Sequence, residues 1–167
     1  MSLSIPIPEV SCMKLLFKQR FFSWFDSYDI YDEQGNTYFT VEGKFAWGHL
    51  FHILNSQGVH VGTLEEQIFR FLPHFNLYEG ARKVGEIVKE FTFLHPRFTM
   101  DCSSWVVEGD WIEWDYTIRD GNRIVATISK EIFRWTDTYV LDVADERDAL
   151  RVLMIVLAID AVKCRNN

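Results

Sequence analysis

The residues best suited to bind a ligand are basic side chains near the N-terminus, which lie among aromatic ones. Lys14, Lys18 and Arg20 occupy alternate positions, so they share one face if the segment 14–25 is a regular strand. Basic side chains beside aromatic ones suit an anionic lipid surface. The same pattern also fits an ordinary first strand with its polar face outward. Six residues form the candidate ligand site, the last three only if the fold brings them together: Lys14, Lys18, Arg20, Lys44, Arg82 and Lys83.

The histidines and the acidic residues do not predict a metal site. His49 and His52 are three residues apart, so within a strand they point to opposite faces and do not converge with His60. The acidic residues of the segment 26–33 lack the alternate ligand spacing around a central glycine that an EF-hand loop needs. We therefore expect no metal ion and no other cofactor.

Sequence motifs for catalysis are absent. The chain has no Gly-x-Ser-x-Gly motif and no glycine-rich phosphate loop, and no base is evident beside a cysteine. Glu113 and Asp115 share one face of a predicted strand, but a glycosidase needs two carboxyl groups on either side of a cleft. Their alternation is that of the exposed side of a sheet. We expect a non-enzymatic protein, and a hydrolase is the least favoured function.

Composition and charge narrow the class of protein. With 167 residues, 48% of them hydrophobic, the chain is expected to form a single domain with a full core, preceded by a loosely ordered segment 1–11. The net charge of −7 disfavours nucleic acid as a partner. Three widely spaced cysteines favour a reducing compartment. No signal peptide is evident at the N-terminus, and we expect a cytoplasmic protein.

The segment from Asp145 to about Lys163 is predicted to be a helix that is buried on every side. Residues 152–159 include no polar side chain, so this stretch has no face suited to water. The run is shorter than the roughly 20 apolar residues that a membrane-spanning helix needs. Asp145 is a suitable N-cap residue. The rest of the chain is therefore expected to surround this helix.

Everything before the helix alternates like strand and is divided by turn residues. The hairpin turns include 32–36, 55–58, 108–110 and 120–122. In the segment 111–118, Ile112 and Trp114 are expected on one face, and Trp111 and Glu113 on the other. The predicted strands are 13–22, 27–31, 37–42, 49–54, 59–69, 75–78, 81–91, 98–102, 105–107, 111–118, 123–133 and 138–143.

Three strands share a local pattern. Residues 61–69 resemble 125–133, and 84–91 are a looser third copy; in each, a valine precedes a small residue and a turn glycine lies a few residues before. A small residue allows a strand to bend or coil, as a closed sheet requires. Chance similarity among strands is the alternative explanation.

The helix distinguishes between two all-β architectures. A sandwich fills its core with its own side chains and leaves no room for a helix that is apolar all round. A barrel of about eight strands is also filled, whereas one of eleven strands can hold a central helix. We therefore predict a mainly β (α+β) fold: a closed antiparallel barrel of about twelve strands around the C-terminal helix.

Several local motifs also resemble those of the LURP-one-related family. They are the turn 31–36, the run Val41-Glu42-Gly43-Lys44, Gly62-Thr63-Leu64 after the turn at Gly58, and the strand 139–141 before a helix ending in Ala158-Ile159-Asp160. The resemblance extends from about Leu15 to Val162. This family is structurally related to the Tubby C-terminal domain and to phospholipid scramblases, which implies a barrel around a central helix.

The resemblance implies a function at membranes rather than a catalytic activity. Tubby domains bind phosphoinositide head groups, scramblases act at bilayers, and plant members of the family are linked to pathogen defence. We expect a cytoplasmic binding module, peripherally associated with anionic phospholipid through a basic and aromatic face. The alternative is a protein–protein interaction scaffold or homo-oligomer that uses exposed aromatic side chains, because six tryptophans exceed what such a core needs.

Overall fold

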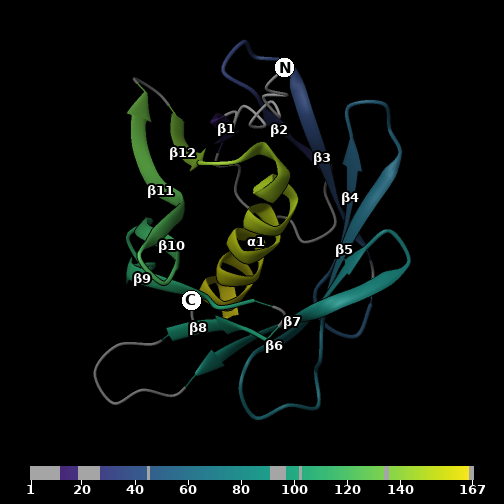
Figure 1. The fold of residues 1–167 in the computed structure, drawn as a ribbon. Helices are drawn as coiled ribbons and strands as arrows, with labels where there is room; N and C mark the ends of the chain where they lie inside the picture. The colour runs from purple at the N-terminus through teal and green to yellow at the C-terminus, as the bar shows by residue number, and fades with distance from the viewer. Residues whose placement is uncertain are drawn as a thin grey trace, which may run out of the picture.

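A barrel of antiparallel strands encloses a C-terminal helix (Figure 1). The computed structural model describes residues 12–18, 27–44, 46–90, 97–101, 103–133 and 136–165; the segment 1–11 lies outside them. Within the described residues the wall has twelve strands: β1 Met13–Lys18, β2 Ser27–Tyr31, β3 Thr37–Lys44, β4 Leu50–Asn55, β5 His60–Glu66, β6 His74–Glu79, β7 Arg82–Glu90, β8 Arg97–Met100, β9 Trp105–Asp110, β10 Asp115–Asp120, β11 Arg123–Phe133 and β12 Thr136–Val143. A 3-10 helix, η1 (Glu146–Asp148), and the helix α1 (Ala149–Arg165) follow.

The strand order is a simple up-and-down meander. Each strand pairs with the next along the chain, and β12 returns to pair with β1, which closes the barrel. In this closing pair Met13 lies opposite Val143 and Lys18 lies opposite Thr138. The predicted fold class, a closed antiparallel barrel around the C-terminal helix, is confirmed.

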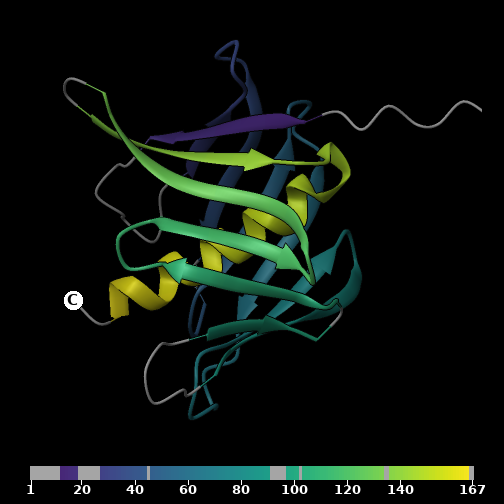
Figure 2. The same ribbon diagram turned by 60° about the vertical axis from the view of Figure 1, so that its left-hand side comes forward.

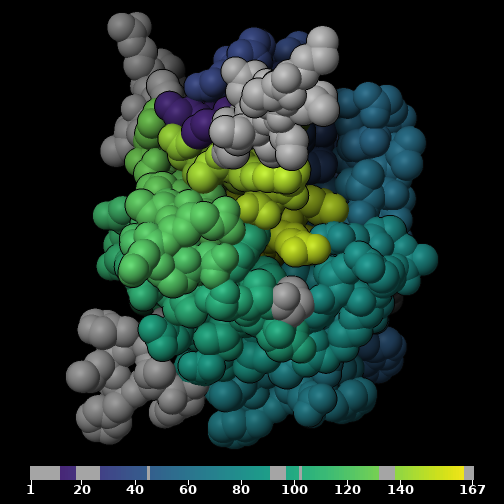
Figure 3. Space-filling view, viewed as in Figure 1, coloured from purple at the N-terminus to yellow at the C-terminus, as the bar shows by residue number. Residues whose placement is uncertain are grey.

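Helix α1 fills the barrel, as its all-round apolar surface predicts. Every residue from Val152 to Val162 is buried, including the carboxyl-bearing Asp160. The helix runs obliquely through the interior (Figure 2), and the strands hide most of it in the space-filling view (Figure 3). Asp145 is the N-cap of η1, because its side chain accepts a hydrogen bond from the backbone N–H of Arg147 at 3.0 Å.

The three similar segments each contain the same irregularity of the sheet. The pairing of β4 with β5 skips Val61, that of β6 with β7 skips Val84, and that of β10 with β11 skips Val125. Each skipped valine directly precedes the small residue of its segment. A bulge of this kind bends a strand and increases its twist, so the shared pattern marks where the wall curves.

Antiparallel order defines two ends of the barrel. Helix α1 begins at the end of the barrel where β12 ends, and it terminates at the other end. Neighbouring strands are antiparallel, so the odd-numbered strands end, and the even-numbered strands begin, at the end where α1 terminates. We call this the helix-exit end. It carries the connections between β3 and β4, between β5 and β6, and between β9 and β10. The contact of the Lys163 amine with the Trp114 ring, 4.5 Å from its centroid, places the end of α1 there.

Among the described residues, three predicted strand boundaries at the helix-exit end are wrong by three residues or more. The strand predicted as 105–107 continues to Asp110, so the predicted hairpin turn 108–110 is part of β9. Residues 111–114 form a turn instead of starting a strand, because the Asp110 side chain accepts hydrogen bonds from the backbone N–H groups of Ile112 and Glu113, at 3.0 and 3.1 Å. Consequently Trp111 is buried and Ile112 is exposed, the reverse of the predicted faces. Similarly, the predicted strand 59–69 already ends at Glu66.

Candidate functional site

The basic residues predicted from the sequence do not form one patch. Lys14 on β1 and Arg82 and Lys83 on β7 lie on strands six positions apart around the barrel, and Lys44 lies at the helix-exit end, away from Arg82. The Lys18 side chain and Arg20 lie outside what the structure describes. A ligand-binding role for these six residues stays a prediction.

Each of the four described basic side chains also has an acidic neighbour. Lys14 is 3.9 Å from Glu33, and Arg82 is 3.8 Å from Glu79. The amines of Lys44 and Lys83 pair with Glu42 and Glu86, respectively. Exposed pairs of this kind add about 0–1 kcal/mol to stability, but each neutralises part of the charge that an anionic ligand would need.

A different surface is exposed at the helix-exit end, where two neighbouring loops present aromatic side chains. Trp47, between β3 and β4, is 89% exposed, while Phe69 and Phe71, between β5 and β6, are 95% and 99% exposed. Large apolar side chains with almost no contact to their own chain indicate an interaction site. We call residues 46–49 and 67–73 the apolar loop pair.

Contacts at their base hold the two loops together. A carboxylate oxygen of Glu66 accepts a hydrogen bond from the backbone N–H of His49 at 3.1 Å, and the backbone N–H of Glu66 donates to the His49 carbonyl at 2.7 Å. Gly48 has a φ of +101°, and a Cβ there would lie 2.5 Å from Cγ2 of Ile68. Glycine is therefore required where one loop passes the other.

A polar network on the outer surface of the wall supports the second loop. The Gln67 amide donates to Oδ1 of Asn76 at 2.6 Å and to a Glu86 oxygen at 3.4 Å. Hydrogen bonds from Lys83 and then His74 lower the pKa of the Glu86 carboxyl to about 2, so it is ionised at neutral pH. The second loop therefore begins at Gln67, whose side chain is held by hydrogen bonds to Asn76 and to the ionised carboxylate of Glu86.

Inside the same end of the barrel, the carboxyl group of Asp160 is buried on α1. Burial raises the pKa of Asp160 to about 7, although Lys163 acts in the opposite direction. Burial, and to a smaller extent the charge of Asp160, raises the pKa values of Tyr28 and Tyr116. The Tyr116 hydroxyl is buried and has no hydrogen-bond partner among the described residues. Trp114, with a φ of 60°, stacks on the ring of Tyr139 with the two ring centroids 4.0 Å apart.

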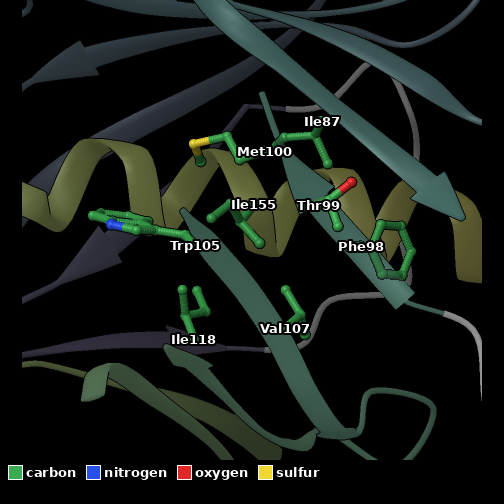
Figure 4. A pocket seen from close by; sticks show the side chains of 8 residues that line it. All are labelled: Ile87, Phe98, Thr99, Met100, Trp105, Val107, Ile118 and Ile155. Atoms are coloured by element: carbon green, nitrogen blue, oxygen red, sulfur yellow. The ribbon is translucent and has the colours of Figure 1, made fainter. Parts of the chain in front are cut away.

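A cavity near the β8–β9 junction is too small to be a ligand site (Figure 4). Its lining is apolar and includes Trp105, Val107 and Ile155, which reach it from β9 and α1. Its volume of about 10 Å³ is room for one water-sized sphere. The two strands pair at a single position there, Thr99 opposite Val106. We interpret the cavity as imperfect packing where the wall is weakly paired.

The described part of the chain offers no arrangement for metal binding. In it, no group of three or more His, Cys, Asp or Glu side chains is placed to hold a metal ion. The rings of His52 and His60 lie 5.0 Å apart, but His49 contacts the Glu66 carboxylate instead. Glu113 and Asp115 are both exposed.

The barrel and its buried helix define a class of protein, and comparison with known proteins agrees. The sequence model described as LURP-one-related matches residues 13–160. The chain therefore belongs to the LURP-one-related family.

Two relatives illustrate the extent of this similarity. The chain is 30% identical over 151 residues to "Uncharacterized protein YxjI" of Bacillus subtilis (strain 168), covering 90% of this chain and 93% of that protein. The X-ray structure of a protein from Arabidopsis thaliana superposes with a TM-score of 0.61 at 16% identity, covering 89% of this chain and 91% of the plant protein. The second likeness shows a shared fold.

Sequence reasoning missed the apolar loop pair because it assigned Ile68 and Phe69 to a strand. The predicted strand was extended to these two apolar residues across Glu65, Glu66 and Gln67, three consecutive polar residues that break the alternation. The signals that could have found the loop are this break in alternation and Pro73, which follows a run of four apolar residues interrupted by Arg70. A strand that ends at Glu66 leaves that run without a buried face.

Proposed function

We propose that this protein is a non-enzymatic module that binds the surface of anionic phospholipid membranes through its apolar loop pair. The observation that carries the proposal is the near-complete exposure of Trp47, Phe69 and Phe71 on two loops joined at their base. Aromatic side chains favour the interface between lipid and water. The loop pair thus replaces the basic strand face that the sequence predicted as the docking surface.

The local charge of the loop pair is compatible with an anionic surface. Although the chain carries a net charge of −7, residues 46–49 and 67–73 include no Asp or Glu, and their one Arg or Lys side chain is Arg70. The repulsive charges therefore lie elsewhere on the molecule. Basic residues near an anionic leaflet contribute about 1 kcal/mol each.

The expected affinity is that of reversible, peripheral binding. Burying one large apolar side chain contributes about 1.5–3 kcal/mol, so three aromatic tips supply on the order of 6 kcal/mol before the cost of immobilisation. That sum corresponds to weak attachment, which a few electrostatic contacts strengthen. Within the described residues, no helix is long and apolar enough to cross a bilayer.

We place this binding at the cytoplasmic face of a membrane. In support, Cys12 is a free, exposed cysteine, as suits a reducing compartment. Its thiol donates to an Asp142 oxygen at 3.3 Å.

Co-flotation with vesicles tests the proposal. Wild-type protein should float with vesicles of phosphatidylcholine and phosphatidylserine at low salt, and the double variant Phe69→Ser, Phe71→Ser should not. Val59→Ser and Ile124→Ser are matched controls, because these side chains are 57% and 46% exposed near the opposite end of the barrel. Equal flotation of the double variant and wild type would refute the proposal, provided that circular dichroism shows both folded.

A protein partner or a second copy of the chain is the second candidate for the same surface. Exposed Trp47 favours it, since tryptophan is enriched among the residues that dominate protein interfaces. Sedimentation without lipid distinguishes the two: a concentration-dependent dimer that Trp47→Ser abolishes would support self-association.

A further inference from the structure

Arg70 differs from the other basic residues considered above, because it lacks an acidic neighbour. It is exposed and lies between Phe69 and Phe71 in the sequence. None of the ion pairs among the described residues includes its guanidinium group. Its Nε–H donates instead to Oε1 of Gln67 at 3.0 Å. This bond ties the guanidinium group to Gln67, which directly follows β5 at the base of the loop.

The orientation of Gln67 is fixed by its other partners. Its amide nitrogen donates to Oδ1 of Asn76 and to a Glu86 carboxylate oxygen, at 2.6 and 3.4 Å. The ionised Glu86 can only accept hydrogen bonds, so the amide nitrogen must face it and the amide oxygen faces Arg70. The backbone N–H of Gln67 also donates to the His74 carbonyl at 2.8 Å. Gln67 is thus a rigid acceptor for one nitrogen of the guanidinium group.

This arrangement leaves both terminal nitrogens of Arg70 available. Within the described residues, neither donates to a protein acceptor. A planar guanidinium group held at Nε is preorganised to donate two parallel hydrogen bonds to one phosphate. If Phe69 and Phe71 enter the boundary between head groups and acyl chains, Arg70, tied to Gln67, lies at the depth of the head groups.

We propose that Arg70 binds the phosphate group of a membrane phospholipid, with Gln67 as its positioning residue. The inference rests on the proposed function, because it requires the apolar loop pair to meet a bilayer. It adds the chemical group that is recognised. Gln67 acts through Arg70 and contacts no lipid.

Substitutions at the two positions separate a fixed, bidentate contact from a simple charge. Arg70→Lys keeps the charge but loses the planar fork, whereas Gln67→Met keeps Arg70 and loses the acceptor that orients it. Each should weaken binding to vesicles of phosphatidylcholine and phosphatidylserine by about five- to tenfold. The double variant Gln67→Met, Arg70→Lys should bind the vesicles no more weakly than Arg70→Lys alone, because both substitutions disrupt the same contact with the phosphate. Arg123→Lys, at the start of β11 near the opposite end of the barrel, is the matched control and should bind like wild type.

A second set of vesicles identifies the recognised group. Neutral galactolipid vesicles carry neither phosphate nor another anionic group, so on them Arg70→Lys should bind like wild type, through the aromatic tips alone. Glycerol phosphate and inorganic phosphate should compete weakly, because neither offers a bilayer to the aromatic tips. Tight calorimetric binding of inorganic phosphate without vesicles would overturn the assignment to lipid.

The outcomes distinguish failure of this inference from failure of the proposed function. If Arg70→Lys and Gln67→Met bind phospholipid vesicles like wild type while the Phe69, Phe71 double variant does not, the phosphate contact is wrong and membrane binding stands. If wild-type protein binds no vesicle, both are wrong. Equal weakening of Arg70→Lys on vesicles with and without phosphate would also refute the inference.

Discussion

The carboxylate of Glu66 accepts a hydrogen bond from the backbone N–H of His49 and thereby ties together the two aromatic loops at the helix-exit end. Its side chain is only 4% exposed, and Nε2 of His49 lies 3.6 Å from the same oxygen. A nearly buried carboxylate is costly unless its bonds are made. The bond therefore indicates that the loops have a defined relative position before any partner arrives.

Replacing Glu66 tests this link. Glu66→Ala leaves the backbone N–H of His49 without its acceptor and should lower the free energy of unfolding by about 1–3 kcal/mol. Amide hydrogen exchange should accelerate in residues 46–49 and 67–73 more than in the opposite hairpin turns. Glu66→Gln retains an acceptor oxygen and should stay close to wild type. Uniform acceleration over the whole barrel would contradict a local role.

Asp160 makes stability depend on pH. Burial raises its pKa from 3.8 to about 7, so the folded state holds the proton more tightly than the unfolded state does. Its stabilising contribution is complete below about pH 4 and is lost as the pH rises through 7. Asp160→Asn should therefore be more stable than wild type at pH 8, by on the order of 4 kcal/mol, and similar at pH 4.

Urea denaturation across this pH range measures the effect. Asp115→Asn, at an exposed position, is the control and should leave the pH profile unchanged. A parallel pH dependence in wild type and Asp160→Asn would show that other groups are responsible.

Gly109 and Gly121 should respond differently to a methyl group. At Gly109, φ is +119° and an added Cβ would lie 2.7 Å from the carbonyl oxygen of Asp115, whereas at Gly121, φ is +56° with nothing within 4 Å. Gly121→Ala should cost about 1–2 kcal/mol through backbone conformation alone. Gly109→Ala adds a clash with backbone and should cost at least about 3 kcal/mol. Thermal unfolding of both variants provides the comparison; equal losses would contradict the clash.

Filling the cavity beside α1 should stabilise the barrel. Val107 lines it, and Val107→Ile adds one methylene, which contributes up to about 0.8 kcal/mol when buried without strain. Val106→Ile, at the neighbouring position on the other face of β9, adds the same group outside and should change little. Calorimetric melting temperatures measure both. A lower melting temperature for Val107→Ile would show that the space cannot accept the group.

The architecture was predictable because the helix has no polar face over residues 152–159. That single property excludes a sandwich and requires an enclosing wall. The valine-plus-small-residue pattern also had structural meaning, since Val61, Val84 and Val125 are the bulged residues of their strands. The apolar helix segment and the valine-containing pattern are both local in sequence. Both reflect which side chains are buried, and burial determines the order of polar and apolar residues more strongly than any other factor.

The candidate site was less accessible to sequence reasoning. Whether Lys14 and Arg82 meet depends on how many strands separate them around the barrel, and no local pattern encodes that. The turn at 111–114 was missed because Asp110 caps it through side-chain hydrogen bonds while the alternation of polar and apolar residues continues. Exposure of Phe69 likewise depends on where β5 stops, and the prediction extended the strand beyond the break in alternation at residues 65–67.

The pairing of β1 with β12 has a consequence for biosynthesis. Cys12 and Asp142, joined by a hydrogen bond across this seam, are 130 residues apart, and α1 is translated later still. The first hairpins must therefore leave the ribosome with no helix to cover their apolar inner faces. The barrel therefore closes only after β12 and α1 have been made, and until then the apolar faces of the earlier hairpins are exposed to aggregation.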